Sequence, residues 1–360
     1  MVKGEVLLVR ADANSQIGTG HFMRCLALAQ TWQEQGGTAV FLMAPGAALG
    51  KRLEDEGIRE VRLSAQPASI ADADESAEVA LRNNATWVAL DGYQFSAEYQ
   101  RALKSKIPHL LLFDDIADAE RYHADLLLNQ NAYAAPDMYA DRAGNCALLL
   151  GATYLLLRRE FQERRDRDRQ IAPRARNLLV TFGGSDAENA TELALQALAL
   201  LPSPAMNVRV LVGASNAQRT ALERVAAKLH HSVEFQTDSK RVADEMVWAD
   251  VAISAAGSTS WELAFMGLPS LLITVSKNQQ GCAQYLHRHG SAISLGRQSQ
   301  VQPVEAAAAL SALVGDKARR GKMSSRGRAL IDGRGAERVV QTMAGITSGQ
   351  AHTTPLTSEK

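Results

Sequence analysis

The chain has 360 residues, enough for two domains of ordinary size at roughly 150 residues each. Hydrophobic residues make up 46% of it and charged residues 22%, a composition typical of soluble globular proteins. The 39 lysines and arginines balance the 39 aspartates and glutamates, so no net charge favours nucleic acid or an anionic membrane as a partner.

The cysteine positions and the hydropathy of the chain exclude further classes of protein. Cys25, Cys146 and Cys282 lie far apart without a CxxC spacing, which argues against a zinc site or a disulfide scaffold and suits a reducing cytoplasm. The N-terminal segment becomes charged too early for a signal peptide, and no apolar run reaches the roughly 18 residues of a membrane span. We therefore expect a cytoplasmic protein without membrane partners, and we expect a monomer.

Short apolar runs alternate with amphipathic stretches along the first 150 residues. EVLLV (5–9) precedes a helical stretch at 21–35, and TAVFLM (38–43) precedes a helix that ends near Gly57. Further strands are predicted at 86–91, 109–115, 124–130 and 147–150. Because these runs are continuously apolar and separated by helices, they predict a parallel sheet covered on both faces.

The composition then changes and the alternation begins again. Residues 155–176 are densely charged and predict a surface helix and linker. After them, strands are predicted at 177–184, 207–213, 232–235, 250–257 and 269–275. The fold class is therefore α/β, with two Rossmann-like domains facing each other across a cleft. We assign an N-terminal domain to 1–158, a linker to 159–176, a C-terminal domain to 177–347 and a disordered tail to 348–360.

Ligands of open parallel sheets bind beyond the carboxyl ends of the strands, and three glycine-containing turns are expected there. The first, IGTGHFMR, allows close backbone approach at Gly18 and Gly20. His21 then opens the helix, and a neutral imidazole at a cleft mouth can take a proton near pH 7. Arg24 follows about one turn later on the same face, as a further substrate-binding candidate. An ordinary tight turn with an exposed histidine fits the glycines equally well.

The second turn is TFGGSDAEN (181–189). We expect Gly183, Gly184 and Ser185 to face a phosphate, because a helix N-terminus offers unpaired N–H groups and the positive end of its dipole. A carboxylate would repel a diphosphate, so Asp186 is expected to cap its own helix and turn away. A plain helix cap without a ligand fits this segment as well.

The third turn is SAAGSTSWELAFMGLP (254–269). It gathers small and hydroxyl residues at a helix start that can bind phosphate oxygens: Gly257, Ser258, Thr259 and Ser260. Glu262 follows just over one turn into the helix, where its carboxylate can accept hydrogen bonds from both hydroxyls of a ribose. A surface glutamate is the simpler alternative.

Three other segments carry weaker signals. Asn278 or Gln279, after a predicted strand, could lie near the sugar or the diphosphate, or could merely cap a helix. Tyr154 could lie near the substrate, whereas Arg158 and Glu160 fit a structural ion pair. The acids of FDDIAD (113–118) resemble a metal cluster, but no third ligand is adjacent, so we predict no metal and no cofactor.

Several of these stretches resemble known families. AAGSTSWELAFMGLP is similar to the nucleotide-sugar site of GT-B proteins such as the UDP-GlcNAc transferase of peptidoglycan synthesis. IGTGHFMRCLALA, LLGATYLLLRREF, the GGSD turn and IDGRGAERV, in this order, resemble the UDP-2,4-diacetamido-2,4,6-trideoxy-β-L-altropyranose hydrolases of pseudaminic acid biosynthesis. The resemblance spans roughly residues 6–340. It implies a GT-B-like fold, no metal, and hydrolysis of the sugar–UDP bond to release the free sugar.

The same resemblance implies roles for individual residues. The family's histidine falls on His21, and Asp91 and Tyr93 of LDGYQF match the family pattern, although Gly92 departs from it. UDP is a good leaving group, so one base can suffice where an ordinary glycosidase needs two carboxyl groups. We expect His21 to act as the general base on water, with inversion at the anomeric carbon.

Two other functions share the expected fold and nucleotide site. A GT-B glycosyltransferase passes the sugar of a UDP-sugar to an acceptor, and a non-catalytic nucleotide-sugar binding protein would not need His21. A transferase should offer an acceptor groove, often apolar or basic, and the N-terminal half shows no basic–aromatic stretch. Fold analogy alone does not choose among the three.

Overall fold

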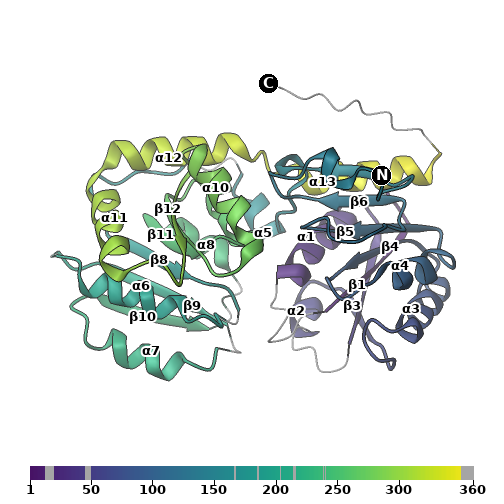
Figure 1. Cartoon of the computed structure of the whole chain (residues 1–360), viewed down its shortest axis with the longest axis horizontal. Coiled ribbons are helices and arrows are strands. Elements are labelled where there is room, and N and C mark those ends of the chain that lie inside the picture. The colour runs from purple at the N-terminus through teal and green to yellow at the C-terminus, as the bar shows by residue number, and fades with distance from the viewer. Residues whose placement is uncertain are drawn as a thin grey trace.

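In the computed structural model of this chain, the described residues are 1–12, 20–44, 50–165, 168–184, 186–202, 204–213, 216–237, 239 and 241–349. They form two α/β domains side by side, each built on one parallel sheet (Figure 1). The expected fold class is therefore confirmed. Within the described ranges, no helix combines the length and the apolar character that crossing a membrane requires.

The N-terminal domain contains a seven-stranded sheet in the order β3-β2-β1-β4-β5-β6-β7, with neighbouring strands parallel. Its strands are β1 (Val6–Ala11), β2 (Thr38–Met43), β3 (Arg59–Arg62), β4 (Ala85–Asp91), β5 (His109–Phe113), β6 (Leu126–Asn129) and β7 (Ala147–Leu150). The chain adds strands on one side of β1 and then continues with β4 on the other. The carboxyl ends of β1 and β4 therefore form the switch point of this sheet, where doubly wound folds bind ligands.

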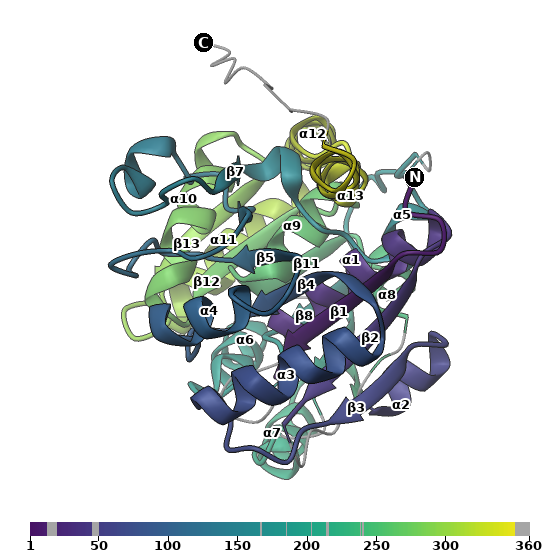
Figure 2. The same cartoon turned by 90° about the vertical axis from the view of Figure 1, so that its right-hand side faces the viewer.

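Helices cover both faces of this sheet, as its continuously apolar strands predict. The helical segments are α1 (Gly20–Glu34), α2 (Gly50–Asp55), α3 (Ile70–Arg82), α4 (Ala97–Lys104), η1 (Pro136–Tyr139) and η2 (Ala152–Tyr154). Leu7 and Val9 of β1 pack with α1 on one face, while Leu8 packs with α3 and α4 on the other. This alternation follows from the two-residue period of a strand. Figure 2 shows α3 and α4 together on one side of the sheet.

The C-terminal domain repeats the design with six strands in the order β10-β9-β8-β11-β12-β13. They are β8 (Asn177–Thr181), β9 (Asn207–Val212), β10 (Ser232–Thr237), β11 (Val251–Ala255), β12 (Ser270–Thr274) and β13 (Ala292–Arg297). Its helical segments are α6 (Ala190–Ala199), α7 (Arg219–Ala226), α8 (Val242–Trp248), α9 (Ser258–Phe265), η3 (Lys277–Gln279), α10 (Gln280–Arg288), α11 (Pro303–Gly315) and α12 (Lys317–Leu330). Here the switch point lies between β8 and β11.

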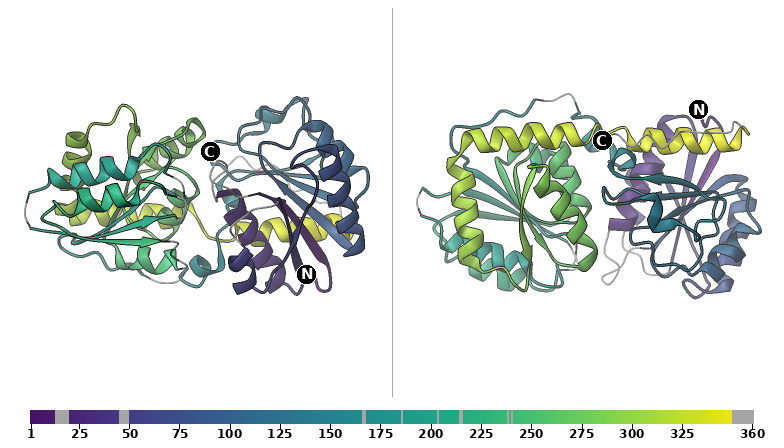
Figure 3. Two further views of the ribbon diagram at one scale, coloured as in Figure 1. Left: turned by 90° about the horizontal axis from the view of Figure 1, so that it is seen from below. Right: turned by 45° about the horizontal axis from the view of Figure 1, so that its top comes forward.

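The last helix, α13 (Gly335–Thr347), leaves the C-terminal domain and packs on the N-terminal one. Val339, Val340 and Met343 enter the core that α1 forms with the N-terminal sheet, and α12 and α13 run end to end along both domains (Figure 3). A Cβ on Gly335 would lie 2.2 Å from the carbonyl oxygen of Leu155, so the crossing requires a glycine. Our assignment of 177–347 to the C-terminal domain is corrected accordingly, because an amphipathic stripe does not reveal which sheet it covers.

The charged linker is also not the surface helix that we expected. Among the described residues of this segment, only α5 (Arg159–Gln162) is helical, and Leu157 and Phe161 are buried. Arg169 donates to the carbonyl oxygens of Met266 at 3.1 Å and Ala249 at 2.5 Å. The linker therefore helps to hold the C-terminal domain together instead of lying free in solvent. Its proposed ion pair does form, with 2.5 Å between Arg158 Nη1 and Glu160 Oε1.

Candidate functional site

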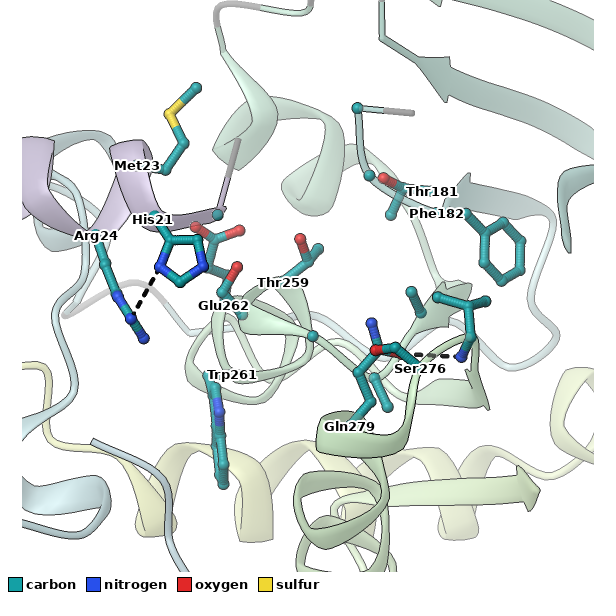
Figure 4. A pocket seen from close by; sticks show the side chains of 18 of the residues that line it. His21, Met23, Arg24, Thr181, Phe182, Thr259, Trp261, Glu262, Ser276 and Gln279 are labelled. Carbon is teal, nitrogen blue, oxygen red and sulfur yellow. Dashed lines mark hydrogen bonds between the residues drawn. The ribbon is translucent and has the colours of Figure 1, made fainter. Parts of the chain in front are cut away.

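A pocket of about 770 Å³ lies between the two domains, at the carboxyl ends of both sheets. The N-terminal wall includes Gly20, His21, Met23, Arg24, Lys51, Arg52, Tyr93, Asp115, Gln130, Asn131 and Tyr133. The C-terminal wall includes Thr181, Phe182, Gly183, Gly184, Gly213, Gly257, Ser258, Thr259, Trp261, Glu262, Ser276, Asn278 and Gln279. Figure 4 shows the labelled residues of both walls around this pocket.

His21 and Asp91 meet at the switch point of the N-terminal sheet. His21 lies in the first turn of α1, and Asp91 is the last residue of the neighbouring strand β4. The distance from His21 Nδ1 to Asp91 Oδ1 is 2.6 Å, and Asp91 is 1% exposed. Burial by itself would raise the pKa of Asp91, but Arg24 and His21 hold that pKa well below its usual range. Asp91 is therefore a buried carboxylate anion beside the imidazole.

Arg24 locks this pair in place. Its Nε and Nη2 donate to the two oxygens of Asp91 at 2.6 and 2.7 Å, and its Nη1 donates to Asp115 Oδ1 at 2.7 Å. These carboxylates take three of the five N–H groups of Arg24, which we expected to bind the substrate, and its side chain still lines the pocket. Arg24 thus holds Asp91 and Asp115 beside His21 through charge-assisted hydrogen bonds.

The same network defines the tautomer of His21. Asp91 is ionised and can only accept a hydrogen bond, so its 2.6 Å contact with His21 Nδ1 needs a proton on that nitrogen. The 3.0 Å contact between Arg24 Nη2 and the same nitrogen is weaker than this bond. His21 Nδ1 therefore carries the proton that is shared with Asp91, which leaves Nε2 with a free lone pair. Within the described part of the chain, Nε2 has no hydrogen-bond partner, and the side chain lines the pocket. This arrangement can accept a proton from a molecule in the pocket.

Tyr93 connects the histidine site to the opposite domain. Its hydroxyl donates to Asp115 Oδ2 at 2.8 Å and accepts from Asn278 Nδ2 at 3.3 Å, while its ring meets the His21 ring edge-on at 4.8 Å. Burial and Asp115 raise the pKa of Tyr93, so its hydroxyl stays protonated. Asn278 thus lies in the pocket, on a contact that spans both domains.

The C-terminal wall presents the start of α9. Gly257 is its N-cap residue, and Ser258 and Thr259 line the pocket after it. A Cβ on Gly20 would lie 4.0 Å from Ser258 Oγ, so the N-termini of α1 and α9 approach each other closely. The first N–H groups of a helix lack intrahelical partners and attract anions, which makes this wall suited to a diphosphate.

The glycine turn after β8 borders the same wall. Gly183 and Gly184 line the pocket, whereas Ser185 lies outside the described residues. Asp186 accepts from the backbone N–H groups of Ala190 at 2.9 Å and Thr191 at 3.0 Å, which confirms that it caps its own helix. It nevertheless lines the pocket, so the expectation that it turns away from the ligand is wrong. A Cβ on Gly213 would lie 2.0 Å from the carbonyl oxygen of Gly184, so the two strand-end loops touch through their backbones.

Two candidate residues do not join the site. Ser260 is 1% exposed, and its hydroxyl donates to the carbonyl oxygen of Gly257 at 2.6 Å, so it serves the helix turn and does not line the pocket. Tyr154 packs against the N-terminal core from η2 and is likewise absent from the pocket wall. Both expectations are corrected, because a sequence shows the position of a side chain along the helix and not the face that it occupies.

Two further candidate residues, Glu262 and Gln279, lie at the pocket wall. Glu262 lines the pocket and accepts from Arg158 Nη2 at 3.1 Å. Burial raises the pKa of Glu262 above its usual range, and Arg158 opposes this rise. Gln279 also lines the pocket, and its Oε1 accepts from the backbone N–H of Val275 at 3.0 Å.

Several wall residues are not evident from the sequence. Asp115 was considered only among the acids that resemble a metal cluster, but it accepts from Arg24 and Tyr93 and also from Asn131 Nδ2 at 2.9 Å. Its position after β5, beside β4, is the signal that could have found it. Among the described residues, no group of three or more His, Cys, Asp or Glu could hold a metal ion.

Comparisons with known proteins define the class. Residues 177–338 match the glycosyltransferase family 28 C-terminal domain. The crystal structure of MurG from Acinetobacter baumannii is similar with a TM-score of 0.65 at 18% identity, covering 95% of this chain and 99% of that one. The chain therefore has the GT-B-like fold, with two parallel-sheet α/β domains and the pocket between them.

Curated relatives narrow the resemblance. The chain is 27% identical over 286 residues to the UDP-2,4-diacetamido-2,4,6-trideoxy-beta-L-altropyranose hydrolase of Campylobacter jejuni, which spans 79% of this chain and 97% of that protein. It is 28% identical over 264 residues to the spore coat polysaccharide biosynthesis protein SpsG of Bacillus subtilis, which spans 66% of this chain and 77% of that protein. The resemblance expected from the motifs is confirmed.

Proposed function

We propose that this protein hydrolyses a UDP-linked 2,4-diacetamido-2,4,6-trideoxy sugar to the free sugar and UDP, within pseudaminic acid biosynthesis. The similarity to the Campylobacter jejuni hydrolase over most of both chains supports the reaction and the sugar class. The observation that carries the proposal is the His21–Asp91 pair, whose free ring nitrogen faces the start of α9 across the pocket.

The two walls divide the chemistry. His21 Nε2 takes a proton from water as the water oxygen bonds to the anomeric carbon, and Asp91 stabilises the resulting imidazolium. The bond between that carbon and the UDP oxygen breaks, and the electron pair leaves with UDP. The α9 N-terminus, with Gly257, Ser258 and Thr259, stabilises the negative charge that develops on the diphosphate.

The remaining wall residues fit substrate binding. Glu262 accepts from the ribose hydroxyls, and Gly183, Gly184 and Gln279 border the nucleotide side. Asn278 and Tyr93 contact each other between the domains, and the Tyr93 ring contacts His21, so we assign both residues to the sugar. Because water and UDP lie on opposite faces of the anomeric carbon, the sugar is released with inverted configuration.

The test is to incubate the protein with the UDP-linked sugar without any acceptor and to assay UDP. We expect steady UDP release, and proton NMR recorded before mutarotation should show the inverted anomer. Retention of configuration would contradict His21 as the base that activates water.

A glycosyltransferase is the second candidate, favoured by the match of residues 177–338 to a glycosyltransferase domain. UDP release that required an added acceptor would establish that function instead. Tight binding of the UDP-sugar without any turnover would leave a binding protein.

A further inference from the structure

Arg158 stands between the linker and the nucleotide wall. It is the residue that precedes α5, is 6% exposed, and its guanidinium lies over the ring of Phe161 at 4.9 Å from the ring centre. Its two terminal nitrogens reach different carboxylates, Glu160 Oε1 at 2.5 Å and Glu262 Oε1 at 3.1 Å. One guanidinium therefore joins a linker acid to the acid that we assign to the ribose.

The bond to Arg158 leaves part of Glu262 available. Arg158 contacts Oε1, and among the described residues Oε2 of Glu262 accepts no hydrogen bond, although the side chain lines the pocket. A carboxylate has about four lone-pair positions, so Oε2 and one position of Oε1 remain for a ligand. Two neighbouring hydroxyl donors match that capacity.

Arg158 also affects the ionisation of Glu262. Burial raises the pKa of Glu262, and the nearby Glu160 adds to this rise, whereas Arg158 lowers it. Glu160 is itself engaged elsewhere, because its Oε2 accepts from the backbone N–H of Ala243 at 3.0 Å and its Oε1 lies 3.8 Å from Arg52 Nη2. Arg158 is thus the cation that directly contacts the Glu262 carboxylate in the described structure.

We propose that Arg158 is a positioning residue for ribose recognition: it holds Glu262 so that the free carboxylate oxygen meets the 2′- and 3′-hydroxyls of the nucleotide. This inference rests on the proposed function, because it needs a ribonucleotide in the pocket. Through Arg158, the start of the linker then contributes to the preference for ribose over deoxyribose. Arg158 also lines the pocket, but the role that we propose for it acts through Glu262.

The experiment compares the binding of UDP and 2′-deoxy-UDP by calorimetry. The wild-type protein should prefer UDP by about tenfold, as expected for a hydrogen bond to a charged group. In Arg158→Met this preference should shrink to about twofold, through weaker UDP binding, because Glu262 loses its fixed orientation. Arg158→Lys should restore part of the preference, since it keeps the charge but not the fork.

A matched control lies next in the chain. Arg159 also pairs with acids, Glu34 at 2.6 Å and Glu56 at 3.2 Å, but it does not line the pocket. Arg159→Met should therefore keep the wild-type preference for UDP. If Arg158→Met fails to fold, the double variant Arg158→Met/Glu160→Gln removes one buried charge of each sign and gives the same readout.

The outcomes separate the two proposals. A wild-type protein that binds no UDP would overturn the proposed function and this inference with it. A wild-type protein that prefers UDP, with the same preference in Arg158→Met, would overturn the inference alone. Lower thermal stability of Arg158→Met with an unchanged preference would reduce Arg158 to a structural ion pair.

Discussion

The two domains present chemically different side chains at equivalent positions of their sheets. Each places the switch point of a parallel sheet at the pocket, between β1 and β4 in one domain and between β8 and β11 in the other. The N-terminal switch point holds buried charged side chains, with His21, Arg24 and Asp91 in one network. The C-terminal switch point offers glycines, hydroxyls and a helix start. One fold thus supports proton transfer on one wall and anion binding on the other.

The largest expected effect comes from His21→Asn. If the N-terminal wall performs the proton transfer, this variant should lose roughly 10²–10⁴-fold in turnover, the usual contribution of a positioned base. UDP affinity should stay unchanged, because the nucleotide lies against the other wall. Steady-state UDP release and calorimetric UDP titration measure the two quantities. His123→Asn is the control, since His123 is on the same domain but away from the pocket. Near-normal turnover in His21→Asn would contradict His21 as the base.

Glu262→Ala tests the other wall. Losing hydrogen bonds to a charged acceptor should weaken UDP binding by about 1.5–3 kcal/mol. Turnover at saturating substrate should change much less than in His21→Asn. The two variants together therefore distinguish the wall that transfers the proton from the wall that binds the nucleotide. Glu223→Ala on α7 serves as the control, because Glu223 pairs with Arg219 away from the pocket. Unchanged UDP affinity in Glu262→Ala would refute the assignment to the ribose.

The sequence predicts the strands and the site motifs better than it predicts which distant residues contact each other. The apolar runs locate the strands closely, with β2 and β7 matching their predicted bounds, since continuous burial in a parallel sheet leaves a clear pattern. His21 and Asp91 lie 70 residues apart in the chain, and only the order of strands brings them together. Motif resemblance suggested both residues, but spacing could not have paired them.

Side-chain direction explains the misses. Ser260 and Ser258 look equivalent in the sequence, yet half a helical turn separates them, so one faces the core and the other the pocket. The apolar stripe of α13 fits either sheet, and only the crossing at Gly335 decides between them. These outcomes depend on packing between distant segments, which local patterns do not record.

The acids of the two walls should respond to pH with opposite signs. Arg24 holds the pKa of Asp91 below its unfolded value near 3.9, so ionised Asp91 stabilises the fold above about pH 4 and this contribution is lost in more acidic solution. Burial raises the pKa of Glu262, so its ionisation costs stability as the pH rises through the folded-state value.

Urea unfolding of two variants from pH 7 to pH 3 checks these signs. Asp91→Asn should be less stable than the wild type at pH 7, with a difference that shrinks as the pH falls below about 4. Glu262→Gln should show no comparable loss at pH 7, because it removes the cost of a buried charge and leaves Arg158 paired with Glu160. A stability loss at neutral pH that is equal in both variants would contradict the contrast between the walls.

The smallest expected effect is that of EDTA, which we predict to leave turnover unchanged. The acids that most resemble metal ligands already have partners, since Asp114 accepts from the Tyr139 hydroxyl at 2.6 Å and Asp115 accepts from Arg24 at 2.7 Å. A cation would have to displace these donors. We therefore expect the α9 N-terminus on the C-terminal wall, and not a metal ion, to stabilise the charge of the diphosphate. Turnover is measured after dialysis against EDTA, with calcium-saturated EDTA as the control. Activity that EDTA abolished and Mg²⁺ or Mn²⁺ restored would mean that the N-terminal wall also binds a metal and that the division between the walls is incomplete.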